Sequence, residues 1–509
     1  MSQNELISKA GIAKNFIYNL LYQIFSLITP FITAPYLSRV LGSAGIGSYS
    51  FSYTISNYFI LIGSLGFIYY AQREIATLQG DRKAQSILFW EIVIARFASI
   101  GIALIIYVGL ILSNLLYDYN VLLTLLTITI FGAALDITFL FQGNDRFGII
   151  AIRNIVIRTI GIILIFVFVK NEEDLWLFVL LQAIIGIISN LSLWSKISDH
   201  VDRVELMQLH PQKHFIPTLK LFIPTVAMSV YTMLDRTLIG ILIPGNKEVL
   251  TSTGILVIKK IADIENGYYE QSEKIVKMAM TLFTSLSTVL ISRNSNDLAK
   301  GDFESFTGNL YLAIKVLFFI GMPTMFGLAA IAENFTPWFF GPGYDKVPYL
   351  IMIFSPITMI IGLSNILGRQ YLIPQKRDNE FTIAICVGAG INLIFNLVLI
   401  PSLQSYGAAI ASVVAEIMVT LVMFIQTRND IDVIEPMRSC WKEVVSAILM
   451  FIIIYFTQKQ LPTNLINTVL LVICEAFLYL GVLYLLEDET LFSLNRLIRN
   501  TLKRRRKNG

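Results

Sequence analysis

Long apolar segments recur along almost the whole chain, and this recurrence constrains the fold more than any other feature. Each segment has about 20 residues or more, the length that an α-helix needs to cross a bilayer. Of the 509 residues, 55% are hydrophobic and 15% are charged, whereas a soluble protein carries about 25% charged residues. Because backbone polar groups in hydrocarbon must be satisfied internally, the sequence predicts an all-α polytopic membrane protein with about 14 transmembrane helices. The predicted spans are 12–37, 46–70, 86–112, 116–142, 148–169, 175–197, 214–243, 267–291, 307–331, 347–371, 380–401, 406–427, 440–460 and 465–487.

Lysine and arginine residues are distributed unevenly among the loops between these spans. With the N-terminus in the cytoplasm, about 26 of them fall on the cytoplasmic side and about 7 on the outside, as the positive-inside rule requires. An even number of spans returns the C-terminus to the cytoplasm, where the tail 488–509 carries a run of basic residues. We expect this tail to contact anionic membrane lipids. We expect no nucleic acid partner, because no folded domain accompanies the tail.

One predicted span, 267–291, differs from the others because polar and charged residues follow one of its faces. Steps of three and four residues place side chains on the same side of a helix. A charge in hydrocarbon is costly, so this face is predicted to line a hydrated central cavity within the protein. The residues of this face are Glu270, Lys274, Lys277, Thr281, Thr284 and Thr288, with Glu273 and Ser285 beside them.

The two halves of the chain resemble each other. The first predicted span ends in Arg39-Val-Leu-Gly42 and the seventh in Arg236-Thr-Leu-Ile-Gly240. Internal repeats are typical of transporters, whose substrate site lies at the repeat interface. We therefore predict two pseudo-symmetric six-helix lobes around the central cavity, plus two C-terminal helices. The predicted parts are an N-terminal lobe at 1–200, a cytoplasmic linker at 201–213, a C-terminal lobe at 214–430, two extra transmembrane helices within 431–487 and a basic cytoplasmic tail at 488–509.

Polar stripes at helical spacing also mark the first, second and seventh predicted spans. Together with the eighth, these spans are expected to face the shared cavity. For single serine and threonine positions, helix–helix packing is the favoured explanation. The candidate substrate-binding residues are Arg236, Lys274, Lys277, Asp235, Glu270, Glu273, Asn19, Tyr22, Tyr53 and Asn57. Accessory charges within spans are Arg96, Arg158, Lys315 and Glu416, for which internal ion pairs are the competing explanation.

The sequence carries no motif for catalysis or for a cofactor. Its three cysteines share no metal or redox spacing, and no GxxxxGK[ST] phosphate-binding loop is present. His210 and His214 are four residues apart, but Pro211 between them argues against a helix that presents both to a metal. We expect a solvated linker there, no metal site, no cofactor and no enzyme activity.

Several short motifs resemble those of the oligosaccharide (O-unit) flippases, the polysaccharide-transport branch of the multidrug/oligosaccharidyl-lipid/polysaccharide exporter superfamily. PYLSRVLGSAGIGSYSF at 35–51 resembles the first loop of that family, and FQG at 141–143 resembles the end of its fourth helix. The stretch 406–411, with Glu416, resembles the start of its twelfth helix, and 267–293 resembles its eighth helix.

The resemblance implies that a polyprenyl-pyrophosphate-linked oligosaccharide crosses the bacterial cell membrane by alternating access, for assembly of a surface polysaccharide. Arg236, Lys274 and Lys277 would hold the anionic head group by charge-assisted hydrogen bonds. Their acidic neighbours would pair with them or bind a coupling cation, Na+ or H+. The implied partners are the lipid-linked oligosaccharide, membrane lipids and the glycan polymerase or glycosyltransferases of the same pathway. One departure is the segment 245–266, which is longer than the family's usual seventh loop and is expected to add an external or gating element.

Two other functions compete with this interpretation. A cation-coupled multidrug/toxin antiporter of the same superfamily would have an acidic and apolar cavity, without three cations on two facing helices. A membrane glycosyltransferase or polymerase would need a sizeable catalytic loop, whereas the loops between the predicted spans are short. The flippase is therefore the preferred interpretation.

Overall fold

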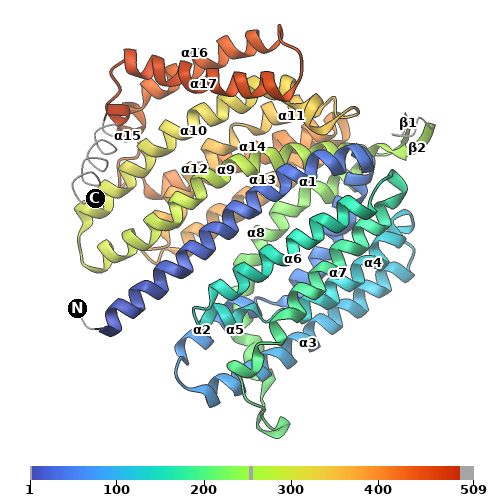
Figure 1. The fold of residues 1–509 in the computed structure, drawn as a ribbon. Coiled ribbons are helices and arrows are strands. Elements are labelled where there is room, and N and C mark those ends of the chain that lie inside the picture. Colours follow the sequence, from blue (N-terminus) through green and yellow to red (C-terminus); the bar gives the residue numbers. More distant parts are fainter. Residues whose placement is uncertain (1–2, 251–255, 493–509) are drawn as a thin grey trace. The chain divides into compact units, whose positions relative to one another are not determined.

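The computed structural model describes the backbone of residues 3–250 and 256–492 (Figure 1). The chain forms two compact units, Met1–Gly267 and Tyr268–Gly509, and the boundary falls within helix α9 (Ile261–Ala299). Each unit is almost entirely helical, which confirms the predicted fold class. Within the described ranges, side chains are described except those at 3–20, 220–221, 223–225, 227–228, 230–231, 250, 282–293, 295–296 and 299.

The first unit contains the helices from α1 to α8 and a two-stranded antiparallel sheet. Its elements are α1 (Gln3–Ser64), α2 (Phe67–Thr77), α3 (Arg82–Leu112), α4 (Asn120–Ala134), α5 (Thr138–Gly143), α6 (Phe147–Phe168), α7 (Leu175–Trp194), α8 (Phe215–Leu242), β1 (Asn246–Leu250) and β2 (Leu256–Lys260). Short 3-10 helices occupy Tyr117–Tyr119, Glu172–Asp174, Ile197–Asp199, Leu206–Gln208 and Pro211–His214.

Helix α1 contains the first predicted span and most of the second. A kink at Gly42 separates its two arms, and the backbone there has φ 66° and ψ 173°. Glycine adopts a positive φ without the steric cost that a Cβ atom would bring. The chain therefore changes direction at a single glycine, where the sequence analysis placed a loop.

The arm of α1 that follows this kink packs closely against the first turns of α9. A Cβ atom added at Gly47 would lie 1.7 Å from the carbonyl oxygen of Asp263. One added at Gly267 would lie 2.0 Å from the carbonyl oxygen of Ser43. Both positions need glycine because two backbones approach each other there. Gly47 of the stretch 35–51 and Gly267 at the start of the stretch 267–293 are therefore both explained by close packing of the backbone.

The segment 245–266 forms a β-hairpin and the first turns of α9. Strands β1 and β2 pair with Asn246 opposite Lys260. The Ile261 amide donates to the Gly245 carbonyl at 3.1 Å, which closes the hairpin at its base. Helix α9 therefore begins at Ile261, ahead of the predicted start at 267.

The two lysines at the end of β2 attach the hairpin to acidic loops of the same unit. Lys259 Nζ lies 3.5 Å from Glu172, in the loop between α6 and α7. Lys260 Nζ lies 2.5 Å from Asp118, between α3 and α4, and 4.6 Å from the centre of the Tyr119 ring. Tyr119 in turn donates to Asp263 at 2.7 Å.

Eleven helical segments within the described residues are long and apolar enough to cross a membrane. Helix α1 provides one of them although it contains parts of two predicted spans. Helices α8 and α9 are not among the eleven, because α9 carries a charged face and because some side chains of both helices lie outside the described residues. These differences account for the discrepancy between the eleven segments and the prediction of about 14 spans.

The second unit contains the rest of α9 and the helices from α10 to α17. The predicted span 347–371 is divided by Pro356, which lacks an amide hydrogen and so interrupts the helix. The elements are α10 (Phe303–Phe340), α11 (Val347–Phe354), α12 (Ile357–Asn365), the π-helix η6 (Ile366–Leu372), α13 (Asp378–Leu403), α14 (Ser405–Thr427), α15 (Ile434–Ser439), α16 (Trp441–Gln458) and α17 (Leu465–Leu485).

Candidate functional site

The charged face of α9 forms two ion pairs that each span one turn of the helix. Lys274 Nζ lies 3.7 Å from Glu270 Oε1 and 3.4 Å from Gln271 Oε1. Lys277 Nζ lies 2.7 Å from Glu273 Oε1. Each lysine follows its carboxylate by four residues, the order that stabilises a helix better than its reverse. These pairs link neighbouring turns of a single helix.

Both lysines remain accessible. The Lys277 side chain is 54% exposed and that of Lys274 is 31% exposed, whereas Glu273 and Glu270 are more enclosed. Ion pairs exposed to this degree contribute only about 0.2–1 kcal/mol. Each pair therefore adds little to protein stability, and its lysine can be reached from solvent.

Some of the predicted polar residues have no described side chain. Asn19, Thr284, Ser285 and Thr288 all lie in helices, but their side chains are outside the described residues. Thr281, one turn beyond Lys277, donates to its own helix at the carbonyl of Met278, at 2.6 Å.

Asp235 and Arg236 lie near the end of α8 in the first unit. Asp235 is buried, and Arg236 is half-buried with its Nη1 donating to the Thr232 carbonyl at 3.2 Å. The Arg236 carbonyl accepts a hydrogen bond from Asn266 Nδ2 at 3.0 Å. This bond fastens the end of α8 to the start of α9, so the Arg236 backbone is held in place.

Tyr22 and Arg158, predicted separately, contact each other. The Arg158 guanidinium lies 5.6 Å from the centre of the Tyr22 ring, which joins α6 to α1 by a cation–π contact. Tyr53 is 38% exposed and stacks on Tyr49 with ring centres 5.5 Å apart. Asn57, one turn along α1, is half-buried. Aromatic and amide groups of this kind suit a sugar ligand.

Arg96 is buried against a break in a helix. The predicted span 116–142 divides into α4 and α5, which leaves the last carbonyls of α4 without intrahelical partners. Arg96 donates through Nη2 to the Ala133 carbonyl at 2.7 Å and through Nη1 to the Asp136 carbonyl. With 1% of its surface exposed, Arg96 stabilises this break.

The predicted site residues are divided between the two units. Arg236 and the residues of α1 belong to the first unit, whereas Lys274 and Lys277 belong to the second. Lys315 on α10 and Glu416 on α14 are half-buried in the second unit. The convergence of these residues on one central cavity stays a prediction.

A buried carboxylate fixes the linker between α7 and α8. Glu91 of α3 is 1% exposed and accepts hydrogen bonds from the His210 amide at 2.8 Å, Lys213 Nζ at 2.9 Å and His214 Nε2 at 2.8 Å. His214 Nδ1 also lies 3.0 Å from the Tyr70 hydroxyl. The prediction of a solvated linker is therefore wrong for His214, which is buried. The available signal was Glu91 itself, because an acid within an apolar span needs a partner.

Other contacts attach the same linker to the start of α3. Arg82 Nη2 lies 2.8 Å from Asp202, and Trp90 Nε1 donates to the Asp202 carbonyl at 3.1 Å. Within the part of the chain that the structure describes, no three His, Cys, Asp or Glu side chains are grouped as a metal site requires. His214 pairs with Glu91, and His200 packs against the Phe141 ring.

A family model described as polysaccharide biosynthesis protein matches residues 12–291, and a second model with the same description matches residues 247–349. The first match covers more than half of the chain. The chain belongs to the polysaccharide biosynthesis protein family. The family resemblance expected from the sequence motifs is thereby confirmed.

Individual members and structural neighbours agree with this family. A putative O-antigen transporter of Escherichia coli (strain K12) is 23% identical over 430 residues, which is 83% of this chain and 98% of the relative. The lipid II flippase MurJ in an inward closed conformation has a TM-score of 0.69 at 15% identity, covering 92% of this chain and 98% of that one. An inward-facing MATE family multidrug transporter has a TM-score of 0.56 at 13% identity, covering 80% and 94%. The protein therefore has the fold of a multi-pass membrane transporter, and these relatives are transporters rather than enzymes.

Proposed function

We propose that the protein is a flippase that moves a polyprenyl-pyrophosphate-linked oligosaccharide from the cytoplasmic to the outer leaflet of the bacterial cell membrane. The accessible ion pairs of α9 are the observation that carries this proposal. Relatives named O-antigen transporter and lipid II flippase support a lipid-linked saccharide as the cargo.

The lysines of α9 are suited to exchange partners when an anionic head group arrives. Each accessible lysine already lies beside a more enclosed carboxylate of its own helix. A pyrophosphate group carries more negative charge than one carboxylate and offers several acceptor oxygens, so it competes strongly with a carboxylate for an ammonium group. Pyrophosphate oxygens would therefore displace Glu270 and Glu273, and the pairs would re-form when the head group leaves.

The displaced carboxylates give the cycle a place for a coupling cation. Glu270 and Glu273 would bind Na+ or a proton when their lysines are engaged with phosphate. Arg236 would supply a third cation, and Tyr22, Tyr53, Asn57 and Asn19 would contact the saccharide. Alternating access would then occur between the lobes 1–200 and 214–430, with both termini in the cytoplasm and glycan-assembling enzymes of the same pathway as partners.

The test removes the two lysine charges and keeps the length of the side chains close to the original. In a cell that depends on this protein for its surface glycan, Lys274→Gln with Lys277→Gln is expected to lower exported glycan at least about tenfold, as loss of one charge-assisted hydrogen bond predicts. Lys300→Gln, an exposed lysine just beyond the same helix, is the matched control. Normal export by the double variant, at an unchanged level of protein in the membrane, would refute the role of these lysines.

The fold of the MATE transporter supports a second candidate, a cation-coupled multidrug antiporter. Such a protein would protect cells against cationic dyes. Deletion of the gene is expected to leave growth in ethidium unchanged and to reduce the surface glycan. The opposite pattern would favour the antiporter over the flippase.

A further inference from the structure

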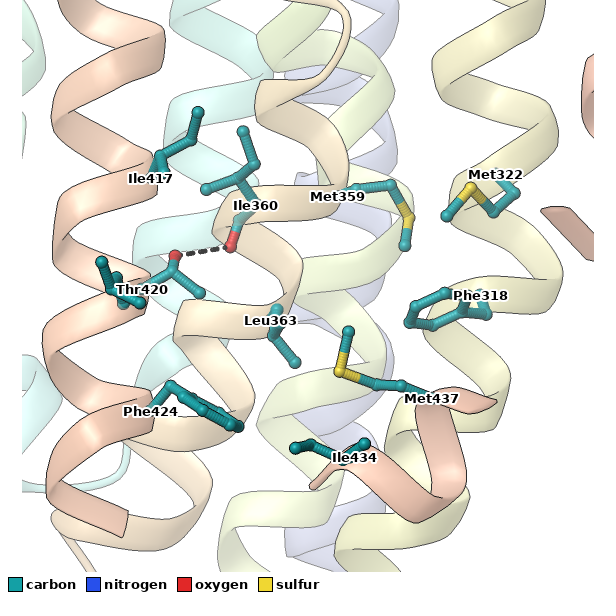
Figure 2. A pocket seen from close by; sticks show the side chains of 11 residues that line it. Phe318, Met322, Met359, Ile360, Leu363, Ile417, Thr420, Phe424, Ile434 and Met437 are labelled. Carbon is teal, nitrogen blue, oxygen red and sulfur yellow. Dashed lines mark hydrogen bonds between the residues drawn. The ribbon is translucent and has the colours of Figure 1, made fainter. Parts of the chain in front are cut away.

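A cavity of about 460 Å³ lies in the second unit between α10, α12, α14 and α15 (Figure 2). Phe318 of α10, Leu363 of α12, Phe424 of α14 and Met437 of α15 contribute to its wall. Cavities that bind small molecules have volumes of about 300–1,000 Å³. The cavity is therefore large enough for a ligand of ordinary size.

The wall of this cavity suits hydrocarbon. Thr420 provides the one hydroxyl among the lining residues, all of which lie in the described part of the chain. That hydroxyl lies 2.9 Å from the Glu416 carbonyl of its own helix and 3.2 Å from the Ile360 carbonyl (Figure 2). Because the hydrogen of this hydroxyl is already engaged and the other lining side chains are apolar, a hydrocarbon chain matches the lining.

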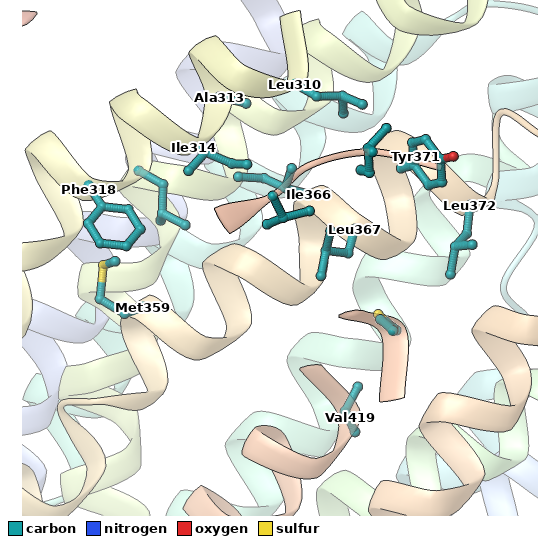
Figure 3. Packing of buried hydrophobic residues seen from close by; sticks show 14 of the residues in the cluster. Leu310, Ala313, Ile314, Phe318, Met359, Ile366, Leu367, Tyr371, Leu372 and Val419 are labelled. Carbon is teal, nitrogen blue, oxygen red and sulfur yellow. The ribbon is translucent and has the colours of Figure 1, made fainter. Parts of the chain in front are cut away.

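The inner wall is held by the core of the unit, so the cavity is preformed. Phe318 and Met359 line the cavity and also belong to the buried cluster that packs α10 against η6 (Figure 3). In that cluster Leu310 and Ile314 of α10 are buried together with Leu367 of the π-helix. Closely packed interiors do not yield easily, and this wall is expected to keep its shape when the cavity is empty.

One end of the cavity lies near the membrane surface. Helices α10, α12 and α14 belong to candidate membrane spans, and the span of α14 ends at Thr427. Phe424, Ile434 and Met437 line the end next to α15, whereas Ile417 lies toward the other end (Figure 2). The cavity therefore runs from within the hydrocarbon toward the boundary where head groups lie.

Two exposed arginines stand at this boundary in register with the cavity wall. Arg428 follows Phe424 by four residues at the end of α14, and Arg438 follows Ile434 by four residues on α15. Residues four apart lie on the same face of a helix. Arg428 thus lies one turn beyond the lining residue Phe424, and Arg438 directly follows the lining residue Met437.

The acidic residues next to these arginines are mostly engaged elsewhere. Asp430 pairs with Arg377 at 2.6 Å. Asp432 accepts from the amides of Ile434 and Glu435 at 3.0 and 3.1 Å, which caps α15. Glu435 remains as an exposed acid on α15. Arg428 and Arg438 are therefore exposed cations close in sequence to the exposed acids Asp432 and Glu435, and a phosphate would have to compete with these acids for them.

We infer that this cavity holds one acyl chain of an anionic membrane phospholipid, whose head group binds Arg428 and Arg438. Hydrocarbon inside and arginine at the mouth match the two parts of such a lipid, and basic sites between transmembrane helices are known to bind anionic head groups. The lipid site lies within the second unit and does not depend on the proposed transport function.

The binding test uses the full-length protein, delipidated in detergent, and native mass spectrometry. Dioleoyl phosphatidylglycerol is expected to bind as one tight copy, and dioleoyl phosphatidylcholine at least about tenfold more weakly, because a cation near a membrane surface contributes about 1 kcal/mol for each anionic contact. Arg428→Gln and Arg438→Gln are each expected to weaken the binding of phosphatidylglycerol roughly fivefold. Glu435→Gln is expected to strengthen this binding. Arg203→Gln, an exposed arginine of the first unit, is the control and should change nothing. Equal binding of the two lipids would overturn the head-group assignment.

The proposed acyl-chain site is tested by filling the cavity from the side that faces the lipid. Leu421 lines the cavity on α14, whereas Ile425, on the same helix and similarly exposed, does not. Leu421→Trp is expected to abolish the tight copy of phosphatidylglycerol, and Ile425→Trp to leave it in place. Equal loss or equal retention in both variants would overturn the assignment of the cavity. Displacement of the bound phosphatidylglycerol by polyprenyl phosphate at equal concentration would instead assign the cavity to the isoprenoid chain and also refute the phospholipid.

Discussion

The linker that precedes α8 and the middle of α9 both place carboxylates beside cations, but they do so in different ways. Glu91 is sealed from solvent and receives three donors from the linker. Glu273 has a lysine of its own helix as a partner, and that lysine is half exposed. The first arrangement joins two distant segments of the chain, whereas the second joins two turns of one helix.

This difference distinguishes charges that fasten segments of the fold from charges that remain accessible. Removal of one partner from a buried pair leaves a charge or a donor without compensation, which is expensive. Loss of an exposed pair within a helix costs little, because water replaces the partner. We therefore expect charges of the first kind to hold the fold and charges of the second kind to be available to a ligand. The following predictions test this separation, from the largest expected effect to the smallest.

The largest effect is expected at Gly267, where α9 packs closely against α1. Gly267→Ala would place a methyl group 2.0 Å from the Ser43 carbonyl. Forcing the two backbones apart is expected to cost about 3 kcal/mol or more, measured as a fall in thermal stability in detergent. Gly101→Ala, in α3 with no atom within 4 Å of the added carbon, should be neutral or stabilising by about 0.5 kcal/mol. Similar stability of the two variants would show that α1 and α9 do not pack as described.

The next largest effect concerns the buried carboxylate. Glu91→Gln removes the negative charge that pairs with Lys213 and alters the contact with His214 Nε2, and it is expected to cost about 2–3 kcal/mol. Glu74→Gln breaks an exposed pair with Arg73 at 3.0 Å and should cost less than about 0.5 kcal/mol. Limited proteolysis of the linker would report the effect locally, since the linker should become more susceptible in the Glu91 variant alone. Equal susceptibility in both variants would contradict a fastening role for Glu91.

A smaller effect on stability, but a larger one on transport, is expected on α9. Glu273→Gln should change the free energy of unfolding by less than about 1 kcal/mol. Glycan export should nevertheless fall clearly. In this variant Lys277 would lack the carboxylate with which it pairs again after the head group leaves. A stability loss as large as that of Glu91→Gln would erase the distinction between the two regions.

The smallest effect is a pH dependence of the linker. His200 lies outside the membrane spans, against the Phe141 ring at 5.5 Å, and burial together with nearby Arg146 lowers its pKa below the usual value. The unfolded chain therefore takes up the proton first as the pH falls, so stability decreases below about pH 6.5. Thermal unfolding at pH 7.5 and 5.5 should show a loss that shrinks in His200→Gln. It should remain in His210→Gln, whose side chain is exposed; the same loss in all three proteins would exclude His200 as the source.

Much of the fold was accessible from the sequence because a bilayer imposes a length and a composition on each helix. The charged face of α9 was equally accessible, since it depends only on local periodicity. The sequence could not show that His214 is buried, because its partner Glu91 lies on a distant helix. Nor could it show that the start of α9 at Ile261 is determined by the closure of a hairpin. Long-range pairing of this kind leaves no periodic trace in the chain.

The candidate site shows the same division. Spacing alone placed Glu270 and Lys274 one helical turn apart. Spacing gave no means to distinguish Arg96, which supports a broken helix, from Arg158, which lies over an aromatic ring. Both are arginines within apolar spans, and only the contacts with other helices separate their roles.

The two ends of the hairpin lie next to each other, since the Ile261 amide donates a hydrogen bond to the Gly245 carbonyl. We therefore expect an insertion between β1 and β2 to leave the end of α8 and the start of α9 in place. A small fluorescent or epitope tag inserted there would report on the protein during transport. The two lysines at the base, bound to Glu172 and Asp118, would keep such a probe anchored to the first unit.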